Sequence, residues 1–266
     1  MMGKQLKGTK WCGKERYHFA KIDSTNKKAK ELAMAGCSHG TLVTAKSQQA
    51  GVGRRGRSWS SEEETGIYMS LVLRPDIKTE SAVSLTLVVA MAVARAINNL
   101  LKECLPEPVS TQIKWPNDIV LHKKKICGIL TELSLEETKI DYIIVGIGIN
   151  VSNRSFPEEI QSMASSILLE TNVEFDKETL IEEVWKQFEY YYAVFLQTED
   201  LQGFKDEYVD LLANQNNKVK VLDPNGEYEG IARGITNTGE LLVETQERIC
   251  EVSSGEVSVR GIYGYV

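Results

Sequence analysis

A glycine- and arginine-rich stretch between two strand-like segments sets the first limit on the fold. Residues 47–57 read S-Q-Q-A-G-V-G-R-R-G-R and formally contain G-x-G-x-x-G, the pattern of dinucleotide-binding proteins. That fingerprint requires a helix directly after the glycines, so that its N-terminus can bind the phosphates. Here an acidic loop follows instead, and residues 67–73 (I-Y-M-S-L-V-L) are typical of a strand. The stretch therefore predicts a loop between strands and argues against a dinucleotide-binding fold.

The residue types of this loop suit an anionic ligand. Gly51, Gly53 and Gly56 permit backbone conformations that other residues avoid, and they let a ligand approach the main-chain N–H groups. Arg54 and Arg55 carry rigid, permanently charged forks that match carboxylate or phosphate. On this stretch alone, a flexible basic loop without a ligand remains an alternative, because the glycine pattern has many false matches.

Composition and charge exclude several classes of protein. The chain has 266 residues, enough for one large domain or a large and a small one, and its net charge of −6 argues against a general nucleic-acid-binding protein. Its five cysteines contain no C-x-x-C pair, which predicts neither a disulfide framework nor a zinc ribbon and favours a reducing cytoplasm. No signal peptide is visible. The most apolar stretch, residues 82–97, falls short of the roughly 20 apolar residues of a membrane span.

Periodicity and turn residues predict a mixed α and β chain that ends in a β-rich module. Strands are expected at 14–22, 41–45, 67–73, 126–132 and 142–151, and helices at 26–35, 80–102, 177–196 and 204–213. Pro116 predicts a bend between two short extended pieces within 113–121, and residues 134–139 predict an acidic hairpin loop. After a linker at 214–217, residues 218–261 are typical of short strands in a barrel-like module, with turns at 223–226 and 237–239.

Four separate stretches carry unusual polar or glycine chemistry: residues 23–26, 48–59, 114–128 and 146–150. Glycines alternate along the last of these, which leaves one face of the predicted strand bare for a ligand or another backbone. The sequence has neither H-E-x-x-H nor a G-x-S-x-G elbow. Together the stretches offer positive charge, backbone donors and one carboxylate. That combination favours binding and polarising a phosphate ester over nucleophilic attack by the protein.

In this order and combination, the motifs of these stretches resemble those of the biotin–protein ligases. The motifs are D-S-T-N (23–26), Q-Q-A-G-x-G-R-R-G-R-x-W (48–59), K-W-P-N-D (114–118), K-I-x-G-I-L-x-E (125–132) and G-I-G-I-N-V (146–151). The resemblance implies an α+β fold: a class II tRNA synthetase-like core, with a mixed sheet and flanking helices, plus a small C-terminal SH3-like β-barrel. It divides the chain into an N-terminal extension (1–16), a biotin- and ATP-binding catalytic domain (17–213) and the C-terminal module (218–266).

The resemblance also implies a two-step, cytoplasmic reaction that uses ATP and Mg²⁺. Biotin is activated to biotinyl-5′-AMP, and the biotinyl group is then transferred to a lysine of a biotin carboxyl carrier protein domain. A homodimer is left open, and neither nucleic acid nor a membrane is implied as a partner. Residues 1–16 are too few for the helix-turn-helix of bifunctional members, so a ligase without repressor function is expected.

The resemblance assigns roles to particular residues. It assigns catalytic roles to Lys125, Arg54, Lys114 and Asp118. It assigns biotin binding to Ser24, Thr25, Asn26, Gln48, Val52, Gly53, Arg54, Lys125, Gly128 and Gly146. Nucleotide binding falls on Arg54, Arg55, Trp59, Asn117, Asp118, Lys125, Ile149, Asn150 and Arg260, with Trp59 near the adenine. Asp118 is also the candidate Mg²⁺ residue, either as a direct ligand or one shell further out.

Two other functions are weighed against the ligase. The chain has Val52 where the family usually has arginine, which would weaken nucleotide binding if that arginine contacts phosphate. Val52 gives some support to a non-catalytic biotin or nucleotide sensor, but the intact Lys114, Asp118 and Lys125 argue more strongly against it. A lipoate–protein ligase shares the core fold but is disfavoured by K-W-P-N-D and the glycine-rich motif. Pyrophosphate release and carrier labelling with biotin or lipoate distinguish the three.

Overall fold

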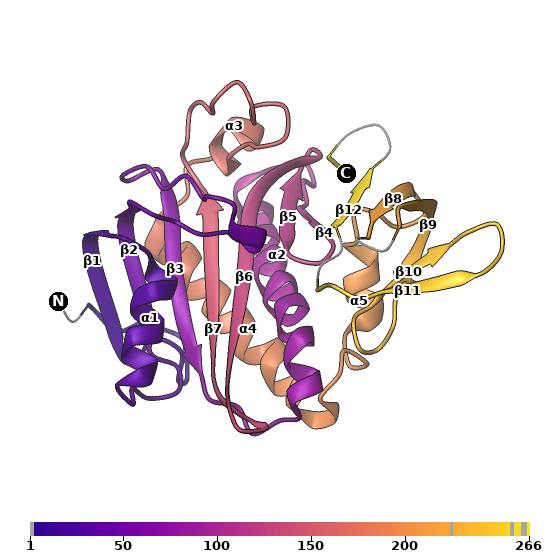
Figure 1. Cartoon of the computed structure of the whole chain (residues 1–266). Helices are drawn as coiled ribbons and strands as arrows, with labels where there is room; N and C mark the ends of the chain where they lie inside the picture. The colour runs from indigo at the N-terminus through magenta and orange to yellow at the C-terminus, as the bar shows by residue number, and fades with distance from the viewer. Residues whose placement is uncertain (1–2, 224–225, 256–257, 262–264) are drawn as a thin grey trace.

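The strand-forming segments up to residue 150 pair into one seven-stranded mixed sheet (Figure 1). The computed structural model describes residues 3–223, 226–255, 258–261 and 265–266. The strands are β1 (Arg16–Ile22), β2 (Leu42–Gln48), β3 (Gly66–Leu73), β4 (Gln112–Lys114), β5 (Asp118–Leu121), β6 (Lys124–Glu136) and β7 (Lys139–Asn150). Their order is β1-β2-β3-β7-β6-β5-β4, with β1 and β2 parallel and the other neighbours antiparallel.

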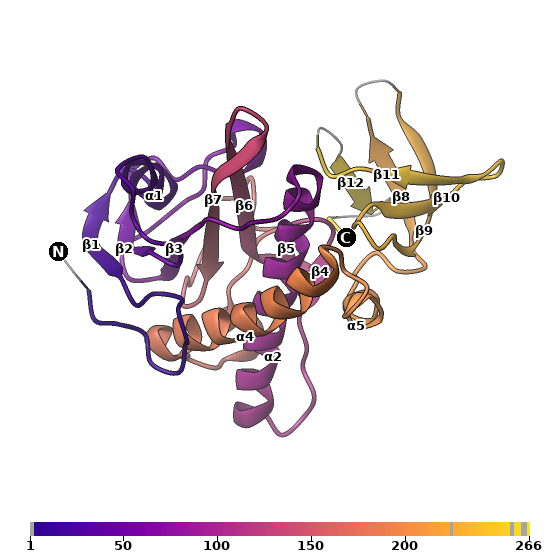
Figure 2. The same cartoon turned by 90° about the horizontal axis from the view of Figure 1, so that it is seen from below.

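Helices cover both faces of this sheet (Figure 2). On one face lies α1 (Thr25–Met34), whose N-terminus is capped by Ser24 of the D-S-T-N motif. The other face is covered by α2 (Leu85–Cys104) and α4 (Lys177–Thr198), the latter capped by Asp176. The aromatic side chains of α4 are buried in the core: Trp185, Phe188, Tyr191, Tyr192 and Phe195. Two short α-helices, α3 (Ile167–Thr171) and α5 (Lys205–Asp210), and two 3₁₀ segments, Arg54–Gly56 and Thr79–Ser84, are also present.

The helical segment Thr79–Cys104 is long and apolar enough to cross a membrane by length and composition, contrary to the sequence expectation for this stretch. Burial decides its role, because 78% of its most apolar window lies inside the folded chain. It packs against both α4 and the sheet. Within the part of the chain that the structure describes, this is a core helix.

A second, five-stranded antiparallel sheet follows α5. Its strands are β8 (Lys218–Leu222), β9 (Tyr228–Ile235), β10 (Leu241–Glu244), β11 (Ile249–Val252) and β12 (Ser258–Gly261). Their order is β11-β10-β9-β8-β12. The turn predicted at 237–239 joins β9 to β10, whereas the turn predicted at 223–226 includes residues 224–225, which lie outside the described residues.

The two sheets share one hydrophobic core. Asn214, in the predicted linker, is fully buried, and the indole N–H of Trp115 donates to the carbonyl of Gly239 at 2.9 Å. The hydroxyl of Ser84 donates to the carbonyl of Thr238 at 2.7 Å. These contacts fix the second sheet beside the K-W-P-N-D turn. The predicted division into residues 1–16, 17–213 and 218–266 stays a prediction.

The hairpin between β6 and β7 corrects one expectation. Residues 134–139 were predicted to be a loop, but β6 runs to Glu136 and β7 begins at Lys139. The turn is confined to residues 137–138, and Glu137 adopts a φ of 55°. Ser134 and Leu135 pair with Tyr142 and Ile140 across the hairpin. The end of this hairpin is largely exposed, so no buried apolar face distinguishes its strands from a polar loop in the sequence.

The segment before β1 is held by a buried carboxylate. Glu189 of α4 is 8% exposed and accepts the backbone N–H groups of Lys10 and Trp11 at 2.7 Å and of Cys12 at 2.8 Å. Because charge-assisted hydrogen bonds to buried groups are strong, we expect Glu189→Gln to lower the free energy of unfolding by about 1–2 kcal/mol, measured by urea titration. The control is Glu182→Gln. The Glu182 carboxylate accepts a hydrogen bond from the backbone N–H of Lys7 at an exposed site. Equal stability of the two variants would contradict this role.

Candidate active site

A strip of glycines leaves part of the α1 face of the sheet bare. Gly146 and Gly148 occupy this face of β7 beyond the end of α1, and Gly128 of β6 lies directly opposite Gly148. A Cβ atom added at Gly148 would lie 2.5 Å from the indole of Trp59, and one added at Gly128 would lie 2.8 Å from it. The bare strand face that the alternating glycines predict is therefore present. It lets Trp59 lie directly on the sheet.

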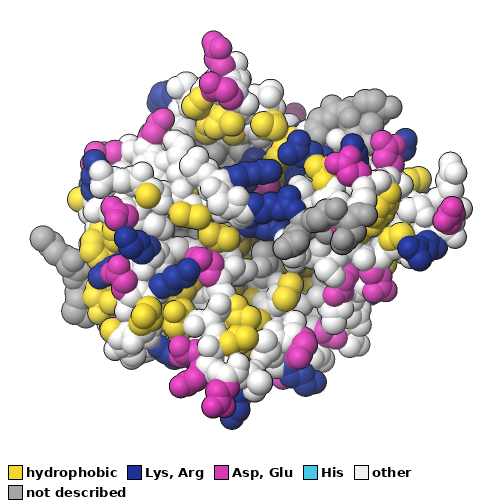
Figure 3. All heavy atoms as spheres, viewed as in Figure 1, with side chains coloured by type: hydrophobic (Ala, Val, Ile, Leu, Met, Phe, Trp, Pro, Cys, Tyr) yellow, Lys and Arg dark blue, Asp and Glu magenta, His cyan; other side chains and the backbone are white. Residues whose placement is uncertain are grey.

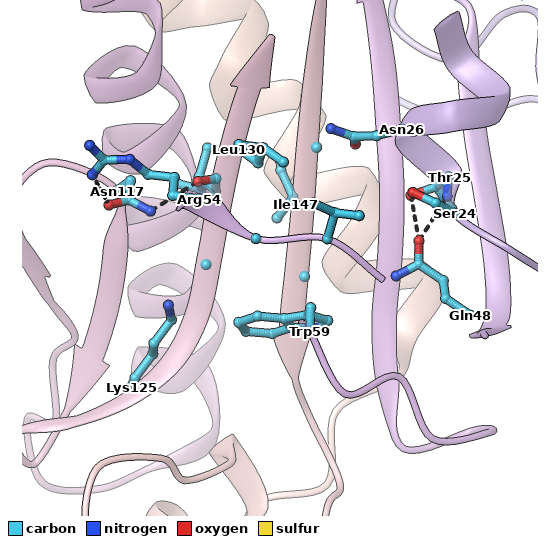
Figure 4. A pocket seen from close by; sticks show the side chains of 16 residues that line it. Ser24, Thr25, Asn26, Gln48, Arg54, Trp59, Asn117, Lys125, Leu130 and Ile147 are labelled. Atoms are coloured by element: carbon cyan, nitrogen blue, oxygen red, sulfur yellow. Dashed lines mark hydrogen bonds between the residues drawn. The ribbon is translucent and has the colours of Figure 1, made fainter. Parts of the chain in front are cut away.

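Polar side chains close one end of this strip, at the N-terminus of α1 (Figure 4). The amide of Asn26 donates to Glu132 at 2.6 Å and accepts from the hydroxyl of Ser70 at 2.6 Å. The Gln48 side-chain oxygen accepts from the backbone N–H of Thr25 at 2.7 Å and from its hydroxyl at 3.1 Å. Each amide is thus held in one orientation, as a site for a polar, uncharged group requires.

Cationic side chains lie beyond the other end of the strip. Nζ of Lys125 lies 2.6 Å from Oδ1 of Asp118 and 5.3 Å from the centre of the Trp59 ring. Lys114 is only 6% exposed, and its Nζ lies 4.4 Å from the ring centre of Tyr265. Burial lowers the pKa of Lys114 to about 8, against the opposing effect of Asp118. Burial by itself would raise the pKa of Asp118, but the charges of Lys125 and Lys114 hold it below its ordinary value.

The glycine- and arginine-rich loop closes over the strip. Val52 and Ser58 form an antiparallel bridge, and the N–H of Gly53 donates to the carbonyl of Arg57 at 2.7 Å. The loop contains a single 3₁₀ turn, Arg54–Gly56, and then continues to β3. The predicted absence of a phosphate-binding helix after the glycines is confirmed.

Arg54 ties this loop to two other parts of the chain. Its guanidinium donates to Oδ1 of Asn117 at 2.8 Å and to the backbone carbonyls of Ser254 and Gly255, the latter at 3.1 Å. Asn117 belongs to the turn between β4 and β5, and Ser254 and Gly255 lie between β11 and β12. Arg54 therefore links the loop, the large sheet and the second sheet.

Two cavities meet at the loop, and Figure 3 shows Lys and Arg side chains gathered around the hollow between the sheets. The narrow pocket over the glycine strip is lined by every residue predicted to bind biotin. A wider cleft of about 650 Å³ is lined by seven of the nine residues predicted to bind nucleotide: Arg54, Arg55, Trp59, Asn117, Asp118, Lys125 and Arg260. Both cavities share Gly53, Arg54, Trp59, Asn117 and Lys125.

Ile149 and Asn150 lie outside both cavities. Ile149 is fully buried in the main core, and the amide of Asn150 donates to the carbonyl of Ser165 at 3.0 Å. Sequence reasoning also missed three site residues: Ser70, Glu132 and Tyr265. The polar residue inside the otherwise apolar strand I-Y-M-S-L-V-L is a signal for Ser70. The places of Glu132 and Tyr265 in the site depend on strand order and on the docking of the second sheet, which short stretches of sequence do not show.

The described part of the site contains neither a reactive thiol nor a preformed metal centre. Cys127 belongs to the main core, and burial raises the pKa of its thiol, so it is not a thiolate. Among the described residues, no group of three or more His, Cys, Asp or Glu side chains could hold a metal ion. Among the described residues that line the cleft, Asp118 is the one carboxylate, and both of its oxygens face protein donors.

Comparison with known proteins places this site in a family. Residues 18–150 match the biotin/lipoate A/B protein ligase family, and residues 216–260 match the biotin protein ligase C-terminal domain. The chain is 38% identical to the bifunctional ligase/repressor BirA of Bacillus spizizenii, over 90% of this chain and 72% of the relative. The chain belongs to the biotin protein ligases. This confirms the predicted membership.

Other relatives and solved structures agree with this membership. The ligase is 31% identical to the biotin–[acetyl-CoA-carboxylase] ligase of Paracoccus denitrificans, over 85% of this chain and 92% of the relative. It is similar to the solved Aquifex aeolicus biotin protein ligase in complex with biotin and ATP, with a TM-score of 0.80 and 31% identity. That match covers 92% of this chain and 98% of the other. The predicted fold class, a synthetase-like core with a C-terminal β module, is confirmed.

Proposed function

We propose that the chain is an ATP-dependent ligase that activates biotin and transfers it to a lysine of a biotin carboxyl carrier protein domain. The observation that carries this proposal is the junction of the two cavities at Arg54 and Lys125. The narrow pocket offers fixed amides at its far end, suited to an uncharged polar head group, and the wide cleft offers cations suited to phosphates. A carboxylate from the first ligand and a phosphate from the second would meet beside Lys125.

The chemistry follows from the charges at this junction. In the first step a biotin carboxylate oxygen attacks the α-phosphorus of ATP, and the bond to the β-phosphate oxygen breaks, giving biotinyl-5′-AMP and pyrophosphate. Both reactants are anions, so Lys125, Lys114 and Arg54 would stabilise the charge that grows on phosphorus and on the leaving group. In the second step a neutral carrier lysine attacks the anhydride carbonyl, AMP leaves and the amine proton is lost. No protein nucleophile is required.

Mg²⁺ fits this site as an ion that arrives with the nucleotide. When bound, it would neutralise charge on the phosphates of ATP. Mg²⁺ usually keeps several waters and binds the phosphates of its substrate, so Asp118, which lines the described part of the cleft, would lie one shell further out. We assign activation to residues 17–213, with Arg260 of the C-terminal module completing the nucleotide wall. The cytoplasm is the proposed compartment, since carrier domains and ATP are found there.

The test is a coupled assay with purified chain, ATP, Mg²⁺ and a carrier domain. Pyrophosphate release that depends on biotin, followed by labelling of one carrier lysine, is the expected result. Lipoate in place of biotin should give neither. Biotin binding without pyrophosphate release would instead support a non-catalytic sensor, and release with lipoate alone would support a lipoate ligase.

Arg54→Gly should leave the first step partly intact but weaken retention of biotinyl-AMP by roughly 1.5–3 kcal/mol, the value of one lost charged hydrogen-bonding group. The reason is that Arg54 fastens the loop to Asn117 and to the β11–β12 connection, while Lys125 and Asp118 remain. The measurement is the dissociation rate of biotinyl-AMP, together with labelling of a bystander protein by the released anhydride.

The control is Arg154→Gly, which removes an exposed guanidinium that lines neither cavity. It should retain the adenylate nearly as well as the wild type. Complete loss of activation in Arg54→Gly, or release no faster than in the Arg154 variant, would show that Arg54 does not retain the intermediate.

A further inference from the structure

Tyr265 lies in the wall of the wide cleft, close in sequence to Arg260, which also lines it. Its hydroxyl donates to Oδ2 of Asp118, and its ring faces the Lys114 ammonium at 4.4 Å. Its neighbour Val266 packs against the end of β12, since a Cβ atom at Gly261 would lie 2.2 Å from the carbonyl of Val266. Tyr265 is therefore held in the cleft by its side chain and by the packing of Val266.

The two oxygens of Asp118 have different protein partners. Oδ1 pairs with Nζ of Lys125 at 2.6 Å, and Oδ2 accepts the Tyr265 hydroxyl. The residue is only 8% exposed, so these partners replace water around a buried charge. The Lys125 ammonium already neutralises Oδ1 and would repel a metal cation there, and among the described residues that line the cleft Asp118 is the single carboxylate. This arrangement does not fit direct ligation of Mg²⁺ by Asp118.

We propose that Tyr265 is a positioning residue of the activation step, which holds Asp118 as the anchor of Lys125 and leaves Mg²⁺ to the phosphates of the nucleotide. The proposal rests on the proposed ligase function. Tyrosine suits this place because one side chain supplies both a hydroxyl for the carboxylate and an aromatic face for the Lys114 ammonium. With Asp118 fixed from the opposite side, the Lys125 ammonium is held at the junction of the cavities, where the reacting oxygens would meet.

Two substitutions separate the hydroxyl from the ring. Tyr265→Phe removes the bond to Asp118 and keeps the ring over Lys114, whereas Tyr265→Leu removes both. We expect kcat for pyrophosphate release to fall roughly tenfold in Tyr265→Phe, the effect of losing a hydrogen bond to a charged group, with KM for biotin unchanged. Tyr265→Leu should show the same loss and a raised KM for ATP. The control is Tyr190→Phe, at a tyrosine that is 61% exposed on α4, and it should match the wild type.

A Mg²⁺ measurement provides a readout besides activity. Calorimetric titration of Mg²⁺ alone into the free wild-type chain should show no saturable binding. In Asp118→Asn, kcat should fall while the Mg²⁺ concentration for half-maximal rate, at saturating ATP, stays within twofold of wild type. Saturable Mg²⁺ binding that Asp118→Asn abolishes, or a tenfold higher Mg²⁺ requirement in that variant, would overturn the proposal.

The outcomes also separate this proposal from the function on which it rests. If the wild type releases no pyrophosphate with biotin, the ligase function fails. If the wild type is active and Tyr265→Phe equals it in kcat, the positioning role fails and the ligase function stands. Thermal unfolding of each variant, compared with Tyr190→Phe, identifies a rate loss that comes from misfolding.

Discussion

Lys125→Ala is expected to raise the activation free energy of biotin-dependent pyrophosphate release by about 2–4 kcal/mol, which slows the reaction on the order of a hundredfold. Lys125 lines both cavities, and its ammonium is held between Asp118 and the ring of Trp59. Its charge therefore stands where the carboxylate and the α-phosphate would meet. Single-turnover release of pyrophosphate measures this effect directly, because it separates activation from transfer to the carrier.

The neighbouring Lys124 supplies the matched control. Its side chain is 43% exposed and lies 3.7 Å from Glu170, a surface pair worth little. Lys124→Ala should therefore release pyrophosphate at nearly the wild-type rate. Because Lys125→Ala also leaves the buried Asp118 without its cation, the unfolding free energy must be measured in parallel. A folded Lys125→Ala variant with wild-type rates would remove Lys125 from the chemistry.

The parts of this site that could be predicted are those that depend on short stretches of sequence. D-S-T-N predicts a helix cap, Pro116 predicts a bend, and alternating glycines predict a bare strand face, because each depends on backbone preferences of adjacent residues. Only the resemblance of the motifs identifies the loop as a ligand-binding element, because its glycines and arginines alone fit several functions.

The parts that could not be predicted depend on which strands become neighbours. Ser70 and Glu132 meet Asn26 because β3, β7 and β6 are adjacent and α1 crosses them, an order that no local pattern encodes. Tyr265 reaches Asp118 only because the second sheet docks beside the K-W-P-N-D turn. Burial likewise decides the role of the apolar helix Thr79–Cys104, which length and composition leave open.

Gly146→Ala is expected to weaken biotin binding by about 2–4 kcal/mol. The added methyl carbon would lie 2.0 Å from Oδ1 of Asn26, so that side chain must move away. Movement breaks its hydrogen bonds to Ser70 and to the charged Glu132, both at 2.6 Å, and together these account for a loss of this size. Equilibrium titration with biotin, without ATP, measures the loss. Gly255→Ala, where a Cβ atom meets nothing within 4 Å, is the glycine control.

A double-mutant cycle with Asn26→Ala tests whether the effect passes through this one side chain. Asn26→Ala alone should weaken biotin binding, because it removes the amide that closes the polar end of the pocket. In that background the methyl of Gly146→Ala has room, since all three nearest atoms to the added Cβ belong to the Asn26 side chain. The second substitution should then cost little further affinity. Additive losses of affinity in the double variant would contradict this explanation. They would mean that Gly146→Ala weakens biotin binding by changing the strand and not by moving the Asn26 side chain.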